Sequence, residues 1–162
     1  MMEATQLLRK QHAEVKTLFG SFKAADGDAQ RLEIFEQIAD ALAAHCVVEE
    51  KLFYPSVYVG RLKEQLQEAV EEHLAAKRLI ADLLDLEPED AQFDAKMTVL
   101  EAEIAHHVEE EEGQLFPQVK RTFALEDLNA LGEEMEDLFD ALQDEEPRLQ
   151  VPAETGAAAP LD

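Results

Sequence analysis

Apolar residues recur every three to four positions along most of the chain, the spacing that places them on one face of a helix. Clusters of Gly, Pro, Asp and other small or polar residues interrupt this pattern. No stretch shows the alternation of a half-buried strand. The pattern therefore predicts an all-α protein, with long helices over residues 3–23, 29–58, 61–86 and 91–122 and a shorter helix over residues 125–145.

The connections between the long helices are short. Residues 24–28 and Gly60 are typical of turns, and residues 87–90 separate the third helix from the fourth. Long helices joined by short turns pack as antiparallel neighbours. We therefore predict an up-down antiparallel four-helix bundle with a short fifth C-terminal helix added to it.

Six prolines mark where the helical pattern changes. Pro55 and Pro117 each lie near the end of a predicted long helix and are expected to kink or close it. Three more fall within residues 146–162, where Pro, Gly and Ala dominate. We expect one bundle domain over residues 1–145 and a disordered tail over residues 146–162.

The chain is strongly acidic, with 14 Lys and Arg against 37 Asp and Glu and a formal net charge of −23. Such a charge repels phosphate, so we expect neither a nucleic acid nor an anionic membrane as a partner. Yet 46% of the residues are hydrophobic, which is too many for a disordered acidic chain. The acidic side chains are therefore expected on a solvated shell around a packed interior.

The number of cysteines and the hydropathy of the chain exclude further classes of protein. Cys46 is the only cysteine, which excludes an internal disulfide and any Cys-based zinc or iron–sulfur site. No N-terminal secretion signal is visible, and no apolar run approaches the ~18 residues that span a bilayer. The expected location is the cytoplasm.

The histidines fall at related positions. In an antiparallel hairpin, two residues lie at the same height when the midpoint of their numbers falls on the turn. The midpoints of His12 and His45, of His45 and His73, and of His73 and His107 all fall on predicted turns. Four histidines from four helices are thus predicted to lie in one layer of the bundle.

Two carboxylates join this layer. Glu49 follows His45, and Glu111 follows His107, by four residues, so each pair shares one helix face, one turn apart. Both faces are otherwise apolar, and a buried carboxylate there is costly unless it is paired or bound to a metal. One or two divalent cations would satisfy all six groups together.

The chain also repeats itself. Residues 42–57 match residues 104–119 at an offset of 62, and residues 12–19 match residues 73–80 at an offset of 61. Each half is a helical hairpin that contributes one His and one His-x-x-x-Glu motif. Two such halves, related by a pseudo-two-fold axis, predict a symmetric site for two metal ions.

Mixed imidazole and carboxylate ligands suit Fe, Mn, Zn or Ni, and a carboxylate-bridged pair inside a helical bundle favours Fe or Mn. Ferritin-like di-iron bundles use Glu-x-x-His, with the Glu first and i, i+3 spacing. Here the His comes first and the spacing is i, i+4, which argues against a ferritin-like site.

His12, the segment from His45 to Pro55, His73, and the segment from His107 to Pro117 together resemble the hemerythrin-like HHE cation-binding family. The resemblance covers roughly residues 5–122. It implies a non-haem di-iron site, oxo- or hydroxo-bridged, in a bacterial-type hemerythrin-like protein. In that reading Glu49 and Glu111 bridge the ions, and the terminal ligands are His12, His45, His73 and His107.

The sequence departs from the O₂-carrying hemerythrins in two places. Those proteins have a second histidine one turn after the histidine of the third helix, where this chain has Lys77. Their fourth helix carries an aspartate five residues after its histidine, whereas Glu111 follows His107 by four. The resemblance therefore favours redox, peroxide, NO or sensing roles over reversible O₂ carriage.

Several neighbouring residues are open alternatives. His106 with Glu110 is a second i, i+4 pair, which would replace His107 and Glu111. Glu50 and Tyr54 are candidates for an extra ligand or a hydrogen bond to a ligand. Cys46 is expected to pack in the core, while Lys16 and Lys77 are expected to reach the rim, pair with Glu or tune bound oxygen species.

Three functions fit these features. The first is a non-haem di-iron protein that binds O₂ or reacts with O₂, peroxide or NO. The second is a metal-stabilised binding or sensor module that signals through residues 125–145. The third is a metal buffer without turnover, favoured by the net charge. Whether the protein is an enzyme, and which protein partner it has, stay open.

Overall fold

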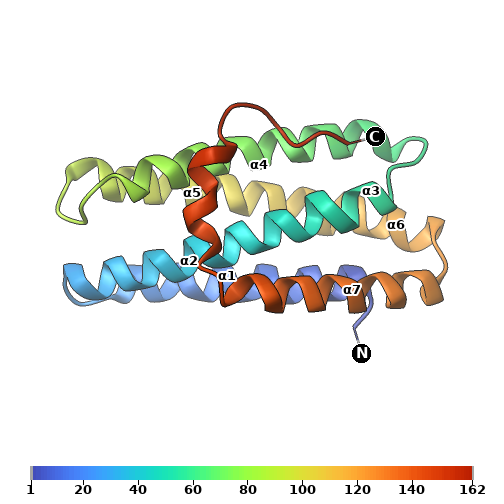
Figure 1. Cartoon of the computed structure of the whole chain (residues 1–162), viewed down its shortest axis with the longest axis horizontal. Helices are drawn as coiled ribbons and strands as arrows, with labels where there is room; N and C mark the ends of the chain where they lie inside the picture. Colours follow the sequence, from blue (N-terminus) through green and yellow to red (C-terminus); the bar gives the residue numbers. More distant parts are fainter. Residues whose placement is uncertain (1, 162) are drawn as a thin grey trace.

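A computed structural model describes residues 2–161. Within that range all regular secondary structure is helical, and there is no strand. The long helices run along the long axis of the molecule, with successive helices reversed in direction (Figure 1): α1 (Ala4–Ala24), α2 (Asp28–Val48), α4 (Leu62–Leu84) and α5 (Ala91–Glu110). The predicted all-α class is confirmed.

The count of helices differs from the predicted four plus one, because two of the predicted long helices are divided. A π-helical turn, η1 (Glu49–Phe53), follows α2 and leads into α3 (Tyr54–Ser56). A second π turn, η2 (Glu111–Leu115), follows α5 and leads into α6 (Phe116–Thr122). Each π turn begins at the glutamate of a His-x-x-x-Glu motif, so the internal repeat extends to the backbone.

The two prolines account for the π turns. Proline lacks an N–H, and its ring clashes with the carbonyl four residues earlier in an α-helix. In η1 the N–H of Tyr54 bonds the carbonyl of Glu49, and in η2 the N–H of Phe116 bonds that of Glu111, each five residues back. The wider turn accommodates the proline ring. The helix ends at Ser56, one residue after Pro55, as expected, whereas after Pro117 it continues to Thr122.

The hydrophobic core is split into two clusters. One contains the first residues of α1, the segment η1–α3, the first half of α4 and α6. The other contains the second half of α1, most of α2, the second half of α4 and the first half of α5. The histidine and glutamate layer lies between them, so apolar side chains cover it on both sides.

The predicted fifth helix is α7 (Leu125–Gln143), which packs against α1, α2 and η1. At Gly132 the backbone of α7 lies very close to the backbone at the start of α1. A Cβ atom at this position would lie 2.4 Å from the carbonyl oxygen of Met2 and 2.9 Å from the nitrogen of Ala4. α7 therefore docks directly on the backbone at the start of α1.

Replacing Gly132 with alanine is expected to destabilise the protein by about 1–3 kcal/mol, because the new methyl group meets backbone atoms. Gly20→Ala is the matched control. Gly20 is exposed inside α1 with nothing near its Cβ position, so that change should stabilise by about 0.5–1 kcal/mol. Urea unfolding at fixed metal content measures both, and equal effects would contradict the close approach.

The C-terminal residues differ from the disordered tail that the sequence predicts. Pro147–Glu154 form a 3₁₀ helix, η3, which packs against α2 and α4. The Arg148 guanidinium donates to Asp40 at 2.9 Å and to Glu36 at 3.0 Å, and Val151 is buried in the second core cluster. Composition alone missed these two anchors among the Pro, Gly and Ala residues.

Replacing Arg148 with alanine is expected to release this segment, because hydrogen bonds to charged groups contribute about 1.5–3 kcal/mol each. Amide hydrogen exchange over residues 147–161 should accelerate by about tenfold or more. Arg121→Ala, an exposed change in α6, is the control and should leave that exchange unchanged. Unchanged exchange in the Arg148 variant would show that apolar packing alone holds the tail.

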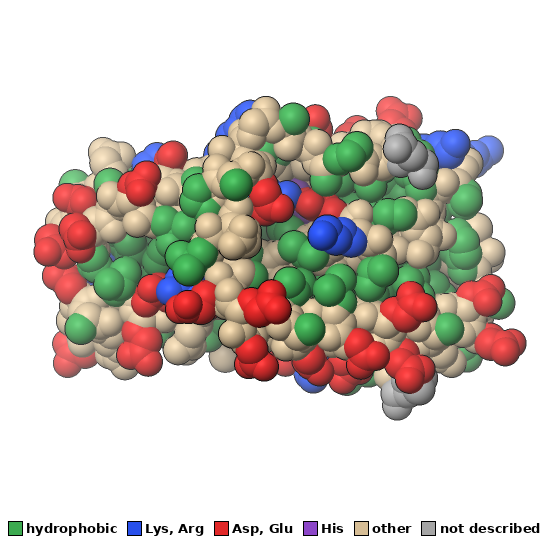
Figure 2. All heavy atoms as spheres, viewed as in Figure 1, with side chains coloured by type: hydrophobic (Ala, Val, Ile, Leu, Met, Phe, Trp, Pro, Cys, Tyr) green, Lys and Arg blue, Asp and Glu red, His purple; other side chains and the backbone are tan. Residues whose placement is uncertain are grey.

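Acidic side chains are spread over the face of the molecule shown in Figure 2, where basic side chains are few. This distribution agrees with the solvated acidic shell expected from the net charge of −23. Among the described residues, no helix combines the length and the apolar character that crossing a membrane requires.

Candidate metal centre

All six residues predicted as metal ligands come together in the layer between the two core clusters. Each long helix supplies one histidine, and each π turn supplies its first residue. All six side chains are buried, and Glu49 is fully so. The group comprises His12 from α1, His45 from α2, Glu49 from η1, His73 from α4, His107 from α5 and Glu111 from η2.

The four histidines form two pairs. The rings of His12 and His45 have centroids 4.9 Å apart, and those of His73 and His107 lie 4.8 Å apart. In the second pair the two Nε2 atoms are 3.2 Å apart. Each pair therefore belongs to one helical hairpin, α1–α2 or α4–α5, as the internal repeat predicts.

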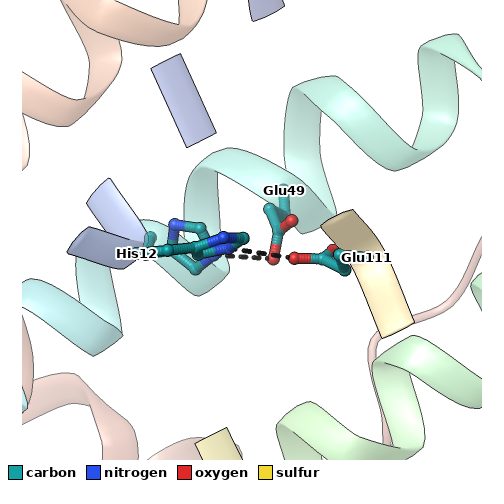
Figure 3. A group of neighbouring side chains, drawn as sticks. His12, Glu49 and Glu111 are labelled. Atoms are coloured by element: carbon teal, nitrogen blue, oxygen red, sulfur yellow. Dashed lines mark ion pairs between the residues drawn. The ribbon is translucent and has the colours of Figure 1, made fainter. Parts of the chain in front are cut away.

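Each glutamate lies between the pairs and touches one histidine of each. Glu49 Oε1 is 3.0 Å from Nε2 of both His45 and His73. Glu111 Oε1 is 3.1 Å from Nε2 of His12 and 3.3 Å from Nε2 of His107. Figure 3 shows His12 facing the two carboxylates. The two carboxylates thus connect the two histidine pairs.

The donor atoms fit a cation. Nε2 of His12, Nε2 of His45, Glu49 Oε2 and Glu111 Oε1 are buried without a hydrogen-bond partner. A buried polar atom without a partner costs about 1–3 kcal/mol. Two groups of ligand atoms lie close enough to hold an ion: His12, His45, Glu49 and Glu111 form one, and Glu49, His73 and His107 form the other. Glu49 is common to both.

The outward Nδ1 atom of every histidine also has a partner. Nδ1 lies 2.7 Å from Glu112 in His12, 2.7 Å from Gln11 in His45, 2.7 Å from Glu50 in His73 and 2.8 Å from Glu72 in His107. An acceptor at Nδ1 keeps the proton there and leaves the Nε2 lone pair facing the centre, as in many metal sites.

These partners form a closed ring around the bundle, because each helical segment orients the histidine of the next. α1 supports α2, η1 supports α4, α4 supports α5, and η2 supports α1. The partners obey the internal repeat: Glu50 corresponds to Glu112, and Gln11 to Glu72. Only Gln11 is uncharged, so His45 alone lacks a carboxylate at Nδ1.

Sequence reasoning missed Gln11, Glu72 and Glu112 as partners. Each stands next to a predicted ligand in the chain, and that adjacency is the signal that was available. The expectation for Glu50 as a hydrogen-bonding neighbour agrees with its contact to His73. Which histidine each partner would reach depends on helix rotation.

Tyr54 enters the centre because of the π turn. In an undisturbed α-helix, nine residues would leave Tyr54 about half a turn away from His45, on the opposite face of the helix. The π turn removes about a quarter turn, and the fully buried Tyr54 hydroxyl donates to Glu111 Oε2 at 2.6 Å. It also lies 3.1 Å from Glu49 Oε1.

Lys77 and Cys46 lie beside His73. The ammonium group of Lys77 is buried and pairs with Glu50 at 2.9 Å, so it supports the partner of His73, one of the roles predicted for it. Cys46 is buried as predicted, and its sulfur lies within 4.8 Å of ligand atoms of Glu50 and His73. Lys16 is exposed on α1.

The alternative pair, His106 and Glu110, points away from the centre. His106 Nε2 lies 3.0 Å from Glu110 and 3.4 Å from Glu72, and its side chain is 61% exposed. The structure thus brings the pair His107 and Glu111 into the layer and leaves the pair His106 and Glu110 outside it.

The carboxylates of the centre favour the protonated form of three of its histidines. Burial alone would lower the pKa values of His12, His73 and His107, but their carboxylate neighbours outweigh it. The pKa of His12 is raised, chiefly by Glu111. For His107, Glu111 and Glu49 raise the pKa well above its usual value, and contacts with Cys46 and Glu49 do the same for His73.

The acidic groups shift in the complementary direction. Burial would raise the pKa of Glu49, but its neighbour His45 and hydrogen bonds within the centre hold that pKa well below its usual range. Burial, Glu111 and Glu49 together raise the pKa of Tyr54 well above its usual value. Tyr54 is therefore a neutral hydrogen-bond donor at neutral pH.

The fold and the site define a class of protein: an all-helical domain with a buried histidine and glutamate cluster able to hold cations. The family model described as hemerythrin HHE cation binding domain matches residues 3–119. The chain belongs to this family.

Two individual proteins are similar to the chain. The crystal structure of a hemerythrin HHE cation binding domain-containing protein from Mycobacterium kansasii superposes with a TM-score of 0.79 at 21% identity, over 90% of both chains. A protein described as a DNA nickase, from Nostoc, is 27% identical over 125 residues. That match covers 77% of this chain and 36% of the Nostoc protein, so the chain spans about a third of its length.

Proposed function

We propose that the chain is a non-haem di-iron protein that reacts with small oxidants such as O₂, peroxide or NO. His12 and His45 would hold one ion and His73 and His107 the other, with Glu49 and Glu111 as the carboxylate ligands between the two pairs. The observation that carries the proposal is the convergence of four imidazole Nε2 atoms on two buried carboxylates. Four imidazoles and two carboxylates suit iron, with manganese or zinc as other occupants.

Two bound iron ions would supply one- and two-electron chemistry toward small oxidants. The chain's own groups prepare the site for it. The Nδ1 partners fix the four rings, the apolar clusters exclude bulk water, and Tyr54 holds a proton on its hydroxyl 2.6 Å from Glu111 Oε2. Tyr54 is the hydroxyl group that lies among the ligand atoms, so it can donate a hydrogen bond to a ligand bound there.

The space beside the centre fits a small ligand. A cavity of ≈ 20 Å³ lies next to the histidine rings, with an accessible surface that is mostly apolar. This is about the room that one water molecule or diatomic molecule occupies. Its apolar lining residues are Val15, Leu42, Ala76, Ile80, Ile104 and Val108.

Reversible O₂ carriage is less well supported. Lys77 stands where the carriers have a fifth histidine, and its ammonium group is engaged with Glu50. His106 does not replace that histidine, because it faces Glu72 and Glu110 at the surface. We therefore expect a centre that stays oxidised after contact with O₂.

The test is an optical spectrum of the anaerobic, iron-loaded protein before and after O₂. We expect oxo-bridged diferric bands that appear with O₂ and persist under vacuum. Bands that vanish under vacuum would establish reversible binding and overturn the preference stated here. The absence of any such band, with iron shown to be absent from the protein, would overturn the di-iron proposal and leave a zinc site, a manganese site or none.

Tyr54→Phe separates a hydrogen-bond donor from a metal ligand. As a donor, Tyr54 gives no tyrosinate-to-iron absorption in the oxidised protein, and the variant should hold the same amount of iron. An absorption band that is present in the parent protein and lost in Tyr54→Phe would make Tyr54 a ligand.

A sensor role is the second candidate, and one contact favours it. α7 packs against η1, the turn that carries Glu49 and Glu50. A change at the centre could thus reach α7 through a shared segment. Hydrogen exchange of residues 125–143 should then differ between reduced and oxidised protein, whereas equal exchange would leave the reaction with oxidants as the function.

Nucleic acid is not expected as a partner. The net charge of −23 repels phosphate, and the Nostoc DNA nickase shares only about a third of its length with this chain. Titration with nicked duplex DNA at low salt checks this, since binding there would contradict the charge argument.

A further inference from the structure

A second group of possible metal ligands lies at the surface next to the centre. His106 and Glu110 are one turn apart on α5, and Glu72 of α4 completes the group, hereafter the peripheral cluster. Its ligand atoms all lie within 4.8 Å of one another. The side chains of His106, Glu110 and Glu72 are 61%, 39% and 21% exposed, so a hydrated ion can reach them.

The peripheral cluster and the buried centre share a cavity of ≈ 40 Å³ between α4 and η2. Glu68, Glu72 and Glu110 line it toward the solvent side, and His107 and Glu111 line its inner part. Glu111 is 2% exposed, and its Oε1 atom has no hydrogen-bond partner. The cavity thus runs from solvent-accessible carboxylates to a buried carboxylate of the centre.

Glu72 links the two groups directly. Its Oε1 atom lies 2.8 Å from Nδ1 of His107, and its Oε2 atom lies 3.4 Å from Nε2 of His106. One carboxylate therefore faces a ligand of the buried centre on one side and the peripheral cluster on the other.

The other opening near the centre suits a cation less well. A groove of ≈ 740 Å³ between α1 and α5 reaches His12, and its charged lining combines Arg9 and Lys16 with Glu101, Glu109 and Glu112. The one carboxylate of that groove beside the centre, Glu112, already pairs with His12 and Arg9. Arg9 and Lys16 offset much of the negative charge of that groove, whereas no described Lys or Arg lines the cavity between α4 and η2, so its carboxylates raise the local concentration of a cation.

We propose that the peripheral cluster binds a divalent cation and passes it through the adjoining cavity to the buried centre. The cluster is an uptake site for metal cargo, separate from the two resident positions. Three exposed ligands bind weakly enough to release the ion, while the buried set retains it. This inference rests on the proposed function to the extent that the buried centre must hold metal.

Matched single variants test it. Glu110→Gln and His106→Ala remove one ligand each from the peripheral cluster. Glu109→Gln, the control, makes the same charge change on the neighbouring residue, which lines the groove on the other side. All three positions are solvent-accessible, and circular dichroism checks that each variant is folded.

The first measurement is the rate of anaerobic Co²⁺ uptake, followed by visible absorption in a stopped-flow instrument. We expect uptake by Glu110→Gln and His106→Ala to slow by about tenfold, with the final content unchanged. Glu109→Gln should load at the parent rate. Equal rates in all four proteins would overturn the proposal.

The second measurement is equilibrium binding of Mn²⁺ to protein whose buried centre is filled with Zn²⁺. We expect one additional weak Mn²⁺ per chain, seen by electron paramagnetic resonance, that is lost in Glu110→Gln and His106→Ala. Its retention in both variants would overturn the peripheral site. A parent protein that takes up no buried Co²⁺ would instead contradict the proposed function, while weak Mn²⁺ binding would still report on the cluster.

Discussion

Glu49→Gln is expected to abolish tight binding of both metal ions, not of one. Glu49 is the residue common to both groups of ligand atoms, and its Oε1 atom lies 3.0 Å from a histidine of each pair. Loss of a hydrogen-bond partner of a ligand already costs about 10–100-fold in affinity, so loss of a shared ligand should cost more than about a hundredfold. Metal analysis after dialysis against a weak chelator measures this.

The glutamine variant keeps the volume of the side chain, so a loss of metal is not a packing defect. Glu33→Ala is the control, because Glu33 is exposed on α2, the helix that precedes Glu49. We expect Glu111→Gln to behave like Glu49→Gln and Glu110→Gln to retain both ions. Two tightly held ions in Glu49→Gln would remove this residue from the centre.

Metal affinity is expected to rise steeply with pH, because ions and protons compete for the same nitrogen atoms. The pKa values of His12, His73 and His107 are raised in the metal-free protein, so these rings bind protons that an ion must displace. The pKa of Glu49 is lowered, and it is already ionised. Release of up to three protons gives at most about a thousandfold gain in combined affinity per pH unit.

The metal-free protein should respond to pH in the opposite sense. A histidine with a raised pKa adds stability below its unfolded value of 6.5, and that stability is lost as pH rises through the folded value. The lowered pKa of Glu49 adds stability above 4.5, which is lost on acidification. Metal-free stability should therefore be highest between about pH 4.5 and 6.5.

Thermal unfolding with and without Zn²⁺, a redox-inert probe, in one series from pH 5 to 9 checks both pH dependences, that of metal affinity and that of metal-free stability. The difference in unfolding temperature between the zinc-loaded and metal-free protein should widen as pH rises. A constant difference would mean that the histidines are already neutral in the metal-free protein.

Much of the fold follows from helical periodicity and turn residues. The bounds of α1, α4 and α7 lie within two residues of the predicted segments, because Gly, Pro and Asp clusters end them cleanly. The heights of the four histidines follow from turn positions alone. Because the two halves of the chain repeat the same motif, a histidine placed at the wrong height in one half would not have matched its counterpart in the other half.

The features of the fold and the site that the sequence did not predict depend on helix rotation and on contacts between distant segments. A spacing of 3.6 residues per turn fixes which side chains share a face only while the helix is regular. The sequence could therefore name Tyr54 as a candidate but could not place its hydroxyl against Glu111. The partner of each histidine, such as Glu72 for His107, depends on how neighbouring helices are turned. The docking of Arg148 on Asp40 joins residues 108 positions apart.

The two π turns also bear on how this chain can tolerate insertions and deletions. Each turn holds one residue more than an α-helix would need between the glutamate and the proline. Removing one residue between Glu49 and Tyr54 would rotate the following segment by about 100°, taking the Tyr54 hydroxyl away from Glu111. The six-residue interval from glutamate to proline, equal in both halves, is therefore a length constraint, stricter than the identity of the residues inside it.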